Sequence, residues 1–156
     1  MTSQFYQDLY RQAQAITADE PNLIANLANL SALLFEQLEH VNWAGFYLLD
    51  RSVTSHQELI LGPFQGRVAC LRIPFGKGVC GTAAATRATQ LVHDVHEFPG
   101  HIACDAASNA EVVVPLIVND EVVGVLDIDS PVTGRFNQDD AAGLSLFAQV
   151  AMQLKW

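Results

Sequence analysis

The chain has 156 residues and a formal net charge of −9 at pH 7; hydrophobic residues make up 50% of it and charged residues only 16%. A chain of this length and composition is expected to bury a substantial core in one domain, which excludes intrinsic disorder. Seventeen Asp and Glu residues outweigh eight Lys and Arg residues, so neither nucleic acid nor an anionic membrane is expected as a partner, because both attract cationic surfaces.

The N-terminal segment lacks the basic stretch and the apolar block of a signal peptide. No apolar run approaches the roughly 20 residues of a membrane-spanning helix. The three cysteines cannot all pair with one another, and a domain with this much apolar sequence does not need disulfides for stability. We therefore expect a cytoplasmic protein whose cysteines are reduced at rest.

Two helices are predicted at the start of the chain. Apolar residues recur at helical spacing over residues 5–16 and again over residues 23–38. Asp19 and Pro21, between the two segments, are expected to be the N-cap and an early position of the second helix.

The pattern then changes to that of strands. Segment 43–49 is rich in aromatic residues and predicts a strand with Trp43, Gly45 and Tyr47 on one face. Further short elements are expected in this order: strands at 58–61 and 70–73, a short helix at 81–87 and a strand at 90–92.

Segment 93–109 has little periodicity and is predicted to be a long loop, of a length that is often functional. Strands are predicted at 111–118 and 121–129, joined by a two-residue turn at 119–120. Asn137 is expected to cap a final helix. This order of elements predicts one α+β domain with a largely antiparallel sheet.

Segment 76–81 spells G-x-G-x-x-G, and Asp94 falls about where the ribose-binding acid of a dinucleotide fold would lie. However, the helix that follows is short, Pro74 interrupts the preceding strand, and the second half of such a fold is missing. A glycine-rich turn is therefore favoured.

Four potential metal ligands, His93, His96, His101 and Cys104, lie within twelve residues. The five-residue spacing of His96 and His101 does not match the metalloprotease helix motif, and the Pro-Gly pair at 99–100 would break a helix. A metal site in a loop stays open beside the simpler interpretation of ordinary surface histidines.

Asp127 and Asp129 are two residues apart on a predicted strand, so both point to one face, which Val123 and Val125 share. This face is either a solvated strand end or part of a pocket. In a pocket, repulsion and burial would raise one carboxyl pKa enough to make that group a proton donor.

Trp43 and Tyr47 are either core residues or, beside acids, a cage for a small cationic or methyl-bearing ligand. Taken singly, the cysteines are typical of small buried hydrophobes. Cys104 differs because it lies in the predicted loop, among histidines that would lower its pKa when charged. It is therefore the best candidate for a nucleophile.

Taken together, four segments resemble the free methionine-(R)-sulfoxide reductases, which are single-domain GAF proteins: NWAGFYL, GKGVCGTAAAT, HDVHEFPGHIACDAASNAEVVVPL and GVLDIDSP. The resemblance covers residues 40–150 directly. Most GAF domains are binding modules without catalytic cysteines, whereas this branch has three cysteines at the spacing found here.

The resemblance implies one GAF domain over residues 1–156, in which the leading helices of residues 1–40 pack on the sheet. It implies a central six-stranded antiparallel sheet flanked by helices, with a ligand pocket on the other face. It also implies the substrate, the R epimer of free methionine sulfoxide. No bound cofactor is expected; thioredoxin is the expected reductant, and a homodimer is an expectation at the level of the family.

Residue roles follow from the matching motifs. By resemblance, Cys104 in HIACD would be the catalytic cysteine, Cys70 the principal resolving cysteine, and Cys80 in GVCG an auxiliary thiol. The residues that would line the substrate pocket are Trp43, Tyr47, Glu111, Asp127 and Asp129.

The chemistry agrees with these roles. Sulfoxide reduction needs a thiolate aimed at sulfur, here that of Cys104, and an acid that protonates the oxygen. Glu111, Asp127 or Asp129 could be this acid if one carboxyl stays protonated, and Glu111 and Asp129 are the first choices. The resulting Cys104 sulfenic acid would condense with Cys70, and a thioredoxin-type dithiol would reduce the disulfide.

The main alternative is a non-catalytic GAF sensor that binds a small ligand or a metal through the same pocket. Stoichiometric zinc in protein purified without a His-tag would favour this alternative.

Overall fold

The computed structural model describes residues 1–102, 104 and 106–156. Residues 103 and 105, which belong to the segment predicted as a long loop, lie outside the described residues. Among the described residues, no helix has the length and apolar character that a membrane crossing requires.

Six strands form one antiparallel sheet in the order β3-β2-β1-β6-β5-β4, which confirms the predicted fold class. The strands are β1 (Trp43–Leu49), β2 (Glu58–Gly66), β3 (Arg72–Pro74), β4 (Gln90–Val92), β5 (Ala110–Val118) and β6 (Glu121–Ser130). The two longest neighbours, β5 and β6, meet at a two-residue turn in which Asn119 and Asp120 both have positive φ, as predicted for a tight hairpin.

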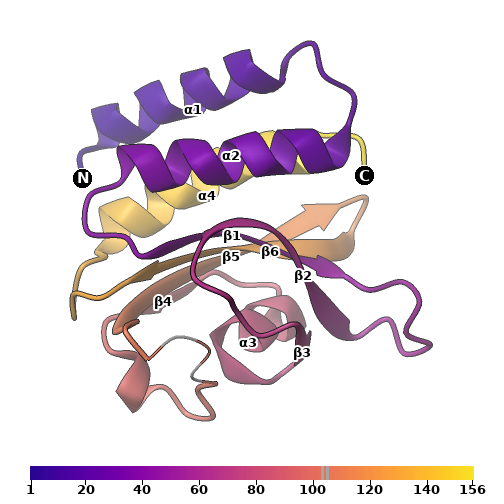
Figure 1. The fold of residues 1–156 in the computed structure, drawn as a ribbon, viewed down its shortest axis with the longest axis vertical. Helices are drawn as coiled ribbons and strands as arrows, with labels where there is room; N and C mark the ends of the chain where they lie inside the picture. Colours follow the sequence, from indigo (N-terminus) through magenta and orange to yellow (C-terminus); the bar gives the residue numbers. More distant parts are fainter. Residues whose placement is uncertain (103, 105) are drawn as a thin grey trace.

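Helices cover both faces of the sheet (Figure 1). On one face, α2 (Leu23–Gln37) packs on β1 and β2, and α4 (Gln138–Met152) packs on β5. Helix α1 (Ser3–Thr17) packs against α4 and α2 and forms the outer layer. On the opposite face, α3 (Gly78–Thr86) packs on β5 and β6. Val95 of the short 3-10 helix η1 (Val95–Glu97) belongs to the buried cluster on this side.

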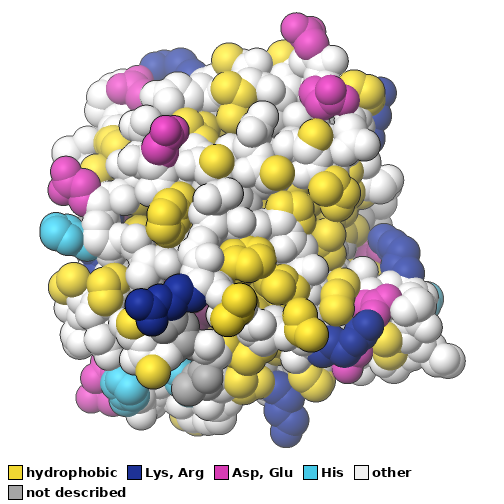
Figure 2. Space-filling view, in the orientation of Figure 1, with side chains coloured by type: hydrophobic (Ala, Val, Ile, Leu, Met, Phe, Trp, Pro, Cys, Tyr) yellow, Lys and Arg dark blue, Asp and Glu magenta, His cyan; other side chains and the backbone are white. Residues whose placement is uncertain are grey.

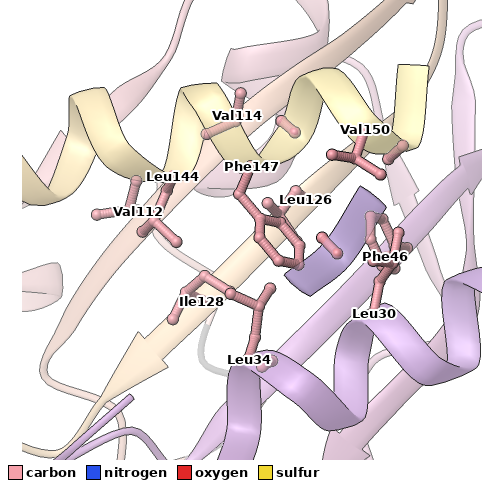
Figure 3. Packing of buried hydrophobic residues seen from close by; sticks show 14 of the residues in the cluster. Leu30, Leu34, Phe46, Val112, Val114, Leu126, Ile128, Leu144, Phe147 and Val150 are labelled. Atoms are coloured by element: carbon pink, nitrogen blue, oxygen red, sulfur yellow. The ribbon is translucent and has the colours of Figure 1, made fainter. Parts of the chain in front are cut away.

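The main core lies between the three-helix layer and the sheet (Figure 3). Leu30 and Leu34 of α2 and Phe147 of α4 pack against Phe46 and Leu126 of the sheet, and all five side chains are fully buried. Burial of each such side chain contributes about 1.5–3 kcal/mol. Because side chains alternate along a strand, the same packing turns the neighbours of Phe46 toward the other face of the sheet.

The N-cap of helix α2 lies three residues later than predicted. Asn22, not Asp19, is the N-cap, because its side chain accepts a hydrogen bond from the Ala25 amide (2.9 Å). Pro21 therefore precedes the helix. At α4 the predicted cap is confirmed, since Asn137 and Asp140 form a reciprocal capping box.

Three other element boundaries differ from the predictions. Strand β2 continues to Gly66 because it stays paired with β1 as far as Trp43. Strand β3 begins at Arg72 rather than residue 70, and α3 begins at Gly78 rather than residue 81. The segment predicted as an unstructured loop contains η1, which Asp94 caps.

A β-bulge overturns one prediction about strand β6. Leu116 pairs with Gly124, but Ile117 pairs with Val122, so Val123 is an extra residue. Val123 therefore packs into the core on the helix side, whereas Val125 packs on the side of α3. The expectation that Val123 shares the face of Asp127 is wrong, because a bulge reverses the alternation of side chains.

A buried carboxylate joins the N-terminal ends of α1 and α4. Asp140 of α4 is 1% exposed and accepts hydrogen bonds from the Tyr6 hydroxyl (2.7 Å) and the Met1 ammonium (3.0 Å). Burial opposes ionisation of Asp140, but these hydrogen bonds and the ammonium charge hold its pKa below the usual value. Its contribution to stability is therefore present at neutral pH and is lost as the pH falls through that lowered pKa.

Tyr6→Phe should lower the free energy of unfolding by about 1.5–3 kcal/mol, because it removes a buried hydrogen bond to a charged group. Urea unfolding at pH 7 measures the loss. Tyr10→Phe is the matched control: the Tyr10 hydroxyl bonds Gln14 at an exposed site, so its effect should stay within about 0.5 kcal/mol. Equal effects of the two substitutions would contradict a structural role for the Tyr6–Asp140 contact.

Candidate active site

Carboxylates and an aromatic side chain form one row across three adjacent strands. Asp129 in β6 lies directly opposite Trp43 in β1 and directly opposite Glu111 in β5. Asp127, two residues along β6, points to the same face. Opposed residues have Cβ atoms about 4.5–5.5 Å apart, so strand pairing brings together the two aspartates, which share one face of β6, and Glu111, which the family resemblance had placed beside them.

Helix α3 covers this row. Its Cys80 is 4% exposed, and the thiol lies 3.9 Å from Glu111 Oε2 as a hydrogen-bond donor. Glu111 and Asp127 are 7% and 4% exposed. The cavity between α3, the sheet and two loops measures about 40 Å³, which exceeds the roughly 10–15 Å³ that one water needs. The predicted site residues that line it are Trp43, Tyr47, Cys80, Cys104, Glu111, Asp127 and Asp129.

The two aromatic residues of β1 hold one wall of the cavity. Trp43 and Tyr47 stack with ring centroids 5.8 Å apart. Trp43 Nε1 donates to the Arg67 carbonyl (3.1 Å), and the Tyr47 hydroxyl donates to the Cys70 carbonyl (2.8 Å). These hydrogen bonds fasten the loop before β3 to the centre of the sheet, so both aromatics are core residues and cavity walls at once.

Position 45 requires glycine because β2 packs closely against this part of β1. A Cβ atom on Gly45 would overlap the Phe64 backbone and side chain in β2. Phe64 in turn stacks on Trp43 with ring centroids 5.0 Å apart. The missing side chain therefore lets Phe64 support the Trp43 ring.

Cys70 and Cys104 form a disulfide across the mouth of the cavity, with their Cα atoms 5.3 Å apart. This differs from the expectation of three reduced cysteines; the Cα separation lies in the range that a disulfide requires. Of the described residues, Cys104 lines the cavity and Cys70 lies outside its lining. Cys80 is a free, buried thiol.

Burial controls the protonation of the acids. Removal from water raises the pKa of Glu111 well above its usual value, and the charges of Asp127 and Asp129 raise it further. Burial also raises the pKa of Asp127, although hydrogen bonds with Glu111, Asp129 and Cys80 oppose this shift. Both shifts favour the protonated carboxyl, and at Glu111 the charges of the two neighbouring aspartates add to the effect of burial.

The same causes make Cys80 a poor nucleophile. Burial raises the pKa of its thiol well above the ordinary value, and the neighbouring acids Asp127 and Glu111 raise it further. A buried thiol of this kind stays protonated and is typically inert.

The predicted group of loop metal ligands is not assembled. His96 Nε2 is hydrogen bonded to Asn109 (3.0 Å), and the Cys104 sulfur is held in the disulfide. In the part of the chain that the structure describes, the group able to hold an ion is instead Cys80, Glu111 and Asp127, whose ligand atoms lie within 4.8 Å of one another. A metal there would have to displace the protons that burial retains on the thiol and the carboxyls.

The G-x-G-x-x-G segment is a glycine-rich turn, as favoured from the sequence. Gly76 and Gly78 have φ of +84° and +64°, and the antiparallel sheet offers no parallel dinucleotide-binding unit. This turn places Lys77 in the cavity lining, a position that sequence reasoning missed although the lysine stands between two glycines.

Further loop residues line the cavity: Val68, Ala69, His101, Ile102 and Ser108. Ser108 is 6% exposed and accepts a hydrogen bond from Asn42 Nδ2 (3.2 Å). Sequence reasoning missed it because nothing local distinguishes a buried serine from an exposed one. His101 also lines the cavity; burial and the charge of His96 lower its pKa, although Asp127 opposes the shift.

Comparisons with known proteins agree with this geometry. A GAF domain family model matches residues 24–154. The free methionine-R-sulfoxide reductase of Escherichia coli (strain K12) is 56% identical over 149 residues, which are 95% of this chain and 87% of the E. coli protein.

Two solved structures of relatives contain their substrate. The substrate complex of fRMsr of Staphylococcus aureus is 51% identical, with a TM-score of 0.87, over 95% of this chain and 94% of that chain. The free methionine-R-sulfoxide reductase of Neisseria meningitidis in complex with its substrate is 44% identical, with a TM-score of 0.91, over 97% of this chain and 88% of that chain. The chain therefore belongs to the GAF domain family and, within it, to the free methionine-R-sulfoxide reductases.

Proposed function

We propose that this chain reduces free methionine (R)-sulfoxide to methionine, with Cys104 as the nucleophile and Cys70 as the resolving cysteine. The observation that carries the proposal is the Cys70–Cys104 disulfide at the mouth of a cavity lined by buried acids. A sulfoxide reductase of this type needs a thiol pair at the surface and a proton source below it, and both are present at one place.

The cavity suits a small zwitterion that carries a methyl-sulfoxide group. Asp127 can hold the ammonium group, and the flat face of Trp43 can receive the methyl on sulfur. Tyr47 closes the same wall. Lys77 is a cation in the lining and is therefore our choice for the substrate carboxylate.

The reaction balances with these groups. The Cys104 thiolate attacks the sulfoxide sulfur, which forms an S–S bond, while Glu111, assisted by Asp129, protonates the oxygen. The hydroxyl then moves from the substrate sulfur to the Cys104 sulfur as the S–S bond to the substrate breaks. This leaves Cys104 as a sulfenic acid and releases methionine with its sulfur reduced by two electrons. The Cys70 thiol then attacks the sulfenic sulfur, which releases water and forms the disulfide. Cys80, as an auxiliary thiol, donates a hydrogen bond to Glu111 and keeps that acid in position.

We further propose thioredoxin as the reductant and the cytoplasm as the location, with no bound cofactor. The support is chemical: a disulfide formed in every cycle must be reduced by a second dithiol, and thioredoxin-type dithiols operate in the cytoplasm.

The reaction is tested by amino-acid analysis of reduced protein mixed with racemic free methionine sulfoxide, thioredoxin, its reductase and NADPH. Conversion should stop near half with the S form left, and Cys104→Ser should form no methionine because it lacks the nucleophile. Folded wild-type protein with three titratable thiols that forms no methionine would overturn the proposal and favour a non-catalytic GAF sensor. The group of Cys80, Glu111 and Asp127 would then be its candidate metal site.

Cys70→Ser should release up to one methionine per enzyme and then stop, because no thiol is left outside the cavity to condense with the sulfenic acid. Quench-flow product counting measures the burst, and the thioredoxin-coupled assay measures cycling. Cys80 is buried and protonated, so it should not substitute. Normal cycling by this variant would transfer the resolving role to Cys80.

The single-turnover rate of reduced enzyme should fall as the pH rises through the raised pKa of Glu111, because deprotonation removes the acid. Glu111→Gln should slow this step about 100-fold near neutral pH and remove the descending limb. Glu97→Gln, a change at an exposed acid, is the matched control and should leave rate and profile unchanged. An unchanged profile in Glu111→Gln would assign proton donation to Asp129 or Asp127.

A further inference from the structure

Exposed hydrophobic side chains gather around the disulfide. In the described part of the chain, the large hydrophobic residues with the greatest exposure are Val68 (88%) and Leu71 (67%), which flank Cys70 at two positions and one position away. Ile102, two residues from Cys104, is 37% exposed. Single exposed hydrophobics are ordinary, but a cluster at a reactive group marks an interaction surface.

The backbone below these side chains is held in place. The Arg67 and Cys70 carbonyls accept the hydrogen bonds from Trp43 and Tyr47, and the Leu71 carbonyl accepts one from the Leu61 amide (2.8 Å). Ile102 packs against Gly78 at the start of α3. The exposed side chains are therefore presented from an ordered loop, which reduces the entropy lost on docking.

Charge is distributed unevenly in the same region. Residues 59–93 contain four Lys and Arg residues and no Asp or Glu, so this segment has a formal charge of +4. Since the whole chain has a net charge of −9, the remaining residues together have a charge of −13. Arg72 and Arg87 form ion pairs with acids outside this segment. Arg67 and Lys77 have no ion-pair partner among the described residues. Lys77 also lines the cavity, but methionine leaves before the disulfide forms, so both charges are available to a partner of the oxidised protein. Figure 2 shows hydrophobic side chains with Lys and Arg side chains among them over the middle and lower part of one face.

We propose that Arg67, Val68, Leu71, Lys77 and Ile102 form a docking surface, here called the reductant surface, for a protein dithiol oxidoreductase. The partner's nucleophilic cysteine would be surrounded by apolar and acidic side chains, which complement this apolar and basic surface on an otherwise acidic protein. The inference deepens the proposed function, on which it rests, by naming where the reductant binds.

The geometry also selects the sulfur that is attacked. Cys104 lines the cavity, whereas Cys70 lies outside its lining, between Val68 and Leu71. The partner's thiolate attacks Cys70, which forms a mixed disulfide, breaks the Cys70–Cys104 bond and releases the Cys104 thiolate into the cavity. The partner's second thiol, as thiolate, then attacks the mixed disulfide, so the partner becomes oxidised and the chain gains two electrons and two protons.

The test measures reduction of the oxidised protein, without any sulfoxide, by reduced thioredoxin and separately by dithiothreitol. Leu71→Asp and Arg67→Glu should each lower the second-order rate constant with thioredoxin about tenfold, because they remove apolar contact or reverse the complementary charge. Their rates with dithiothreitol should stay within twofold of wild type, because a small dithiol needs no docking surface. Leu71→Met should keep the wild-type rate with both reductants.

Ile24→Asp is the matched control, since Ile24 is 55% exposed but lies on α2 in the helix layer; both of its rates should equal those of wild type. Wild-type rates with thioredoxin in Leu71→Asp and Arg67→Glu would overturn the reductant surface. An equal loss with dithiothreitol would also overturn it, because the disulfide itself would then be altered. Failure of the proposed function would give a different result: thioredoxin and dithiothreitol would both reduce the wild-type protein, but the reduced protein would form no methionine from the sulfoxide.

A trapping experiment checks the attacked sulfur. Thioredoxin with its second active-site cysteine replaced by serine should form a stable mixed disulfide with the oxidised protein. Mass mapping of the linked peptides should find Cys70 in it. A link to Cys104 would overturn the assignment of the attacked sulfur to Cys70.

Discussion

Three carboxylates and a thiol line one small cavity, where burial raises the pKa of Glu111, Asp127 and Cys80. Glu111 and Asp127 are more than nine-tenths buried, and Cys80 lies against Glu111 at 3.9 Å. The energy of burying adjacent negative charges is lowered when a proton stays in the cluster. The proposed chemistry depends on that retained proton, because it makes a carboxyl group an acid at neutral pH.

The rest of the fold holds this cluster in place. Helices α2 and α4 cover one face of the sheet, which fixes the pairing of β1, β6 and β5 and therefore the row formed by Trp43, Asp129 and Glu111. On the other face, α3 covers the cavity. The two β1 aromatics then position the loop that carries Cys70. One face of the sheet therefore carries the larger hydrophobic cluster, while the other holds the polar groups of the cavity together.

Local rules predicted much of this arrangement and failed where a residue departed from them. Alternation along β1 and β6 correctly placed Trp43 and Tyr47 on one face and both aspartates on one face, but it left open whether that face was solvated; the structure shows that it lines the cavity. It failed at Val123 because a bulge inserts one residue into β6, and no side-chain pattern marks that position. The cap of α2 was misplaced because Asp19 and Asn22 are both suitable capping residues, and only backbone geometry selects Asn22.

By itself, the amino-acid sequence determined the periodicities that define the strands and helices, the acidic character of the chain, and the motifs that resemble one branch of the GAF proteins. These properties are local or compositional, so they can be read along the chain. The resemblance implied that Cys70 pairs with Cys104, 34 residues away, and the tertiary structure brings their Cα atoms to 5.3 Å. Only the tertiary structure decided that Cys80 meets Glu111, 31 residues away. It also decided that hydrophobic and basic side chains surround that disulfide. Such contacts depend on how the sheet, α3 and the loops pack together, because the number of residues between two positions does not determine their separation in space.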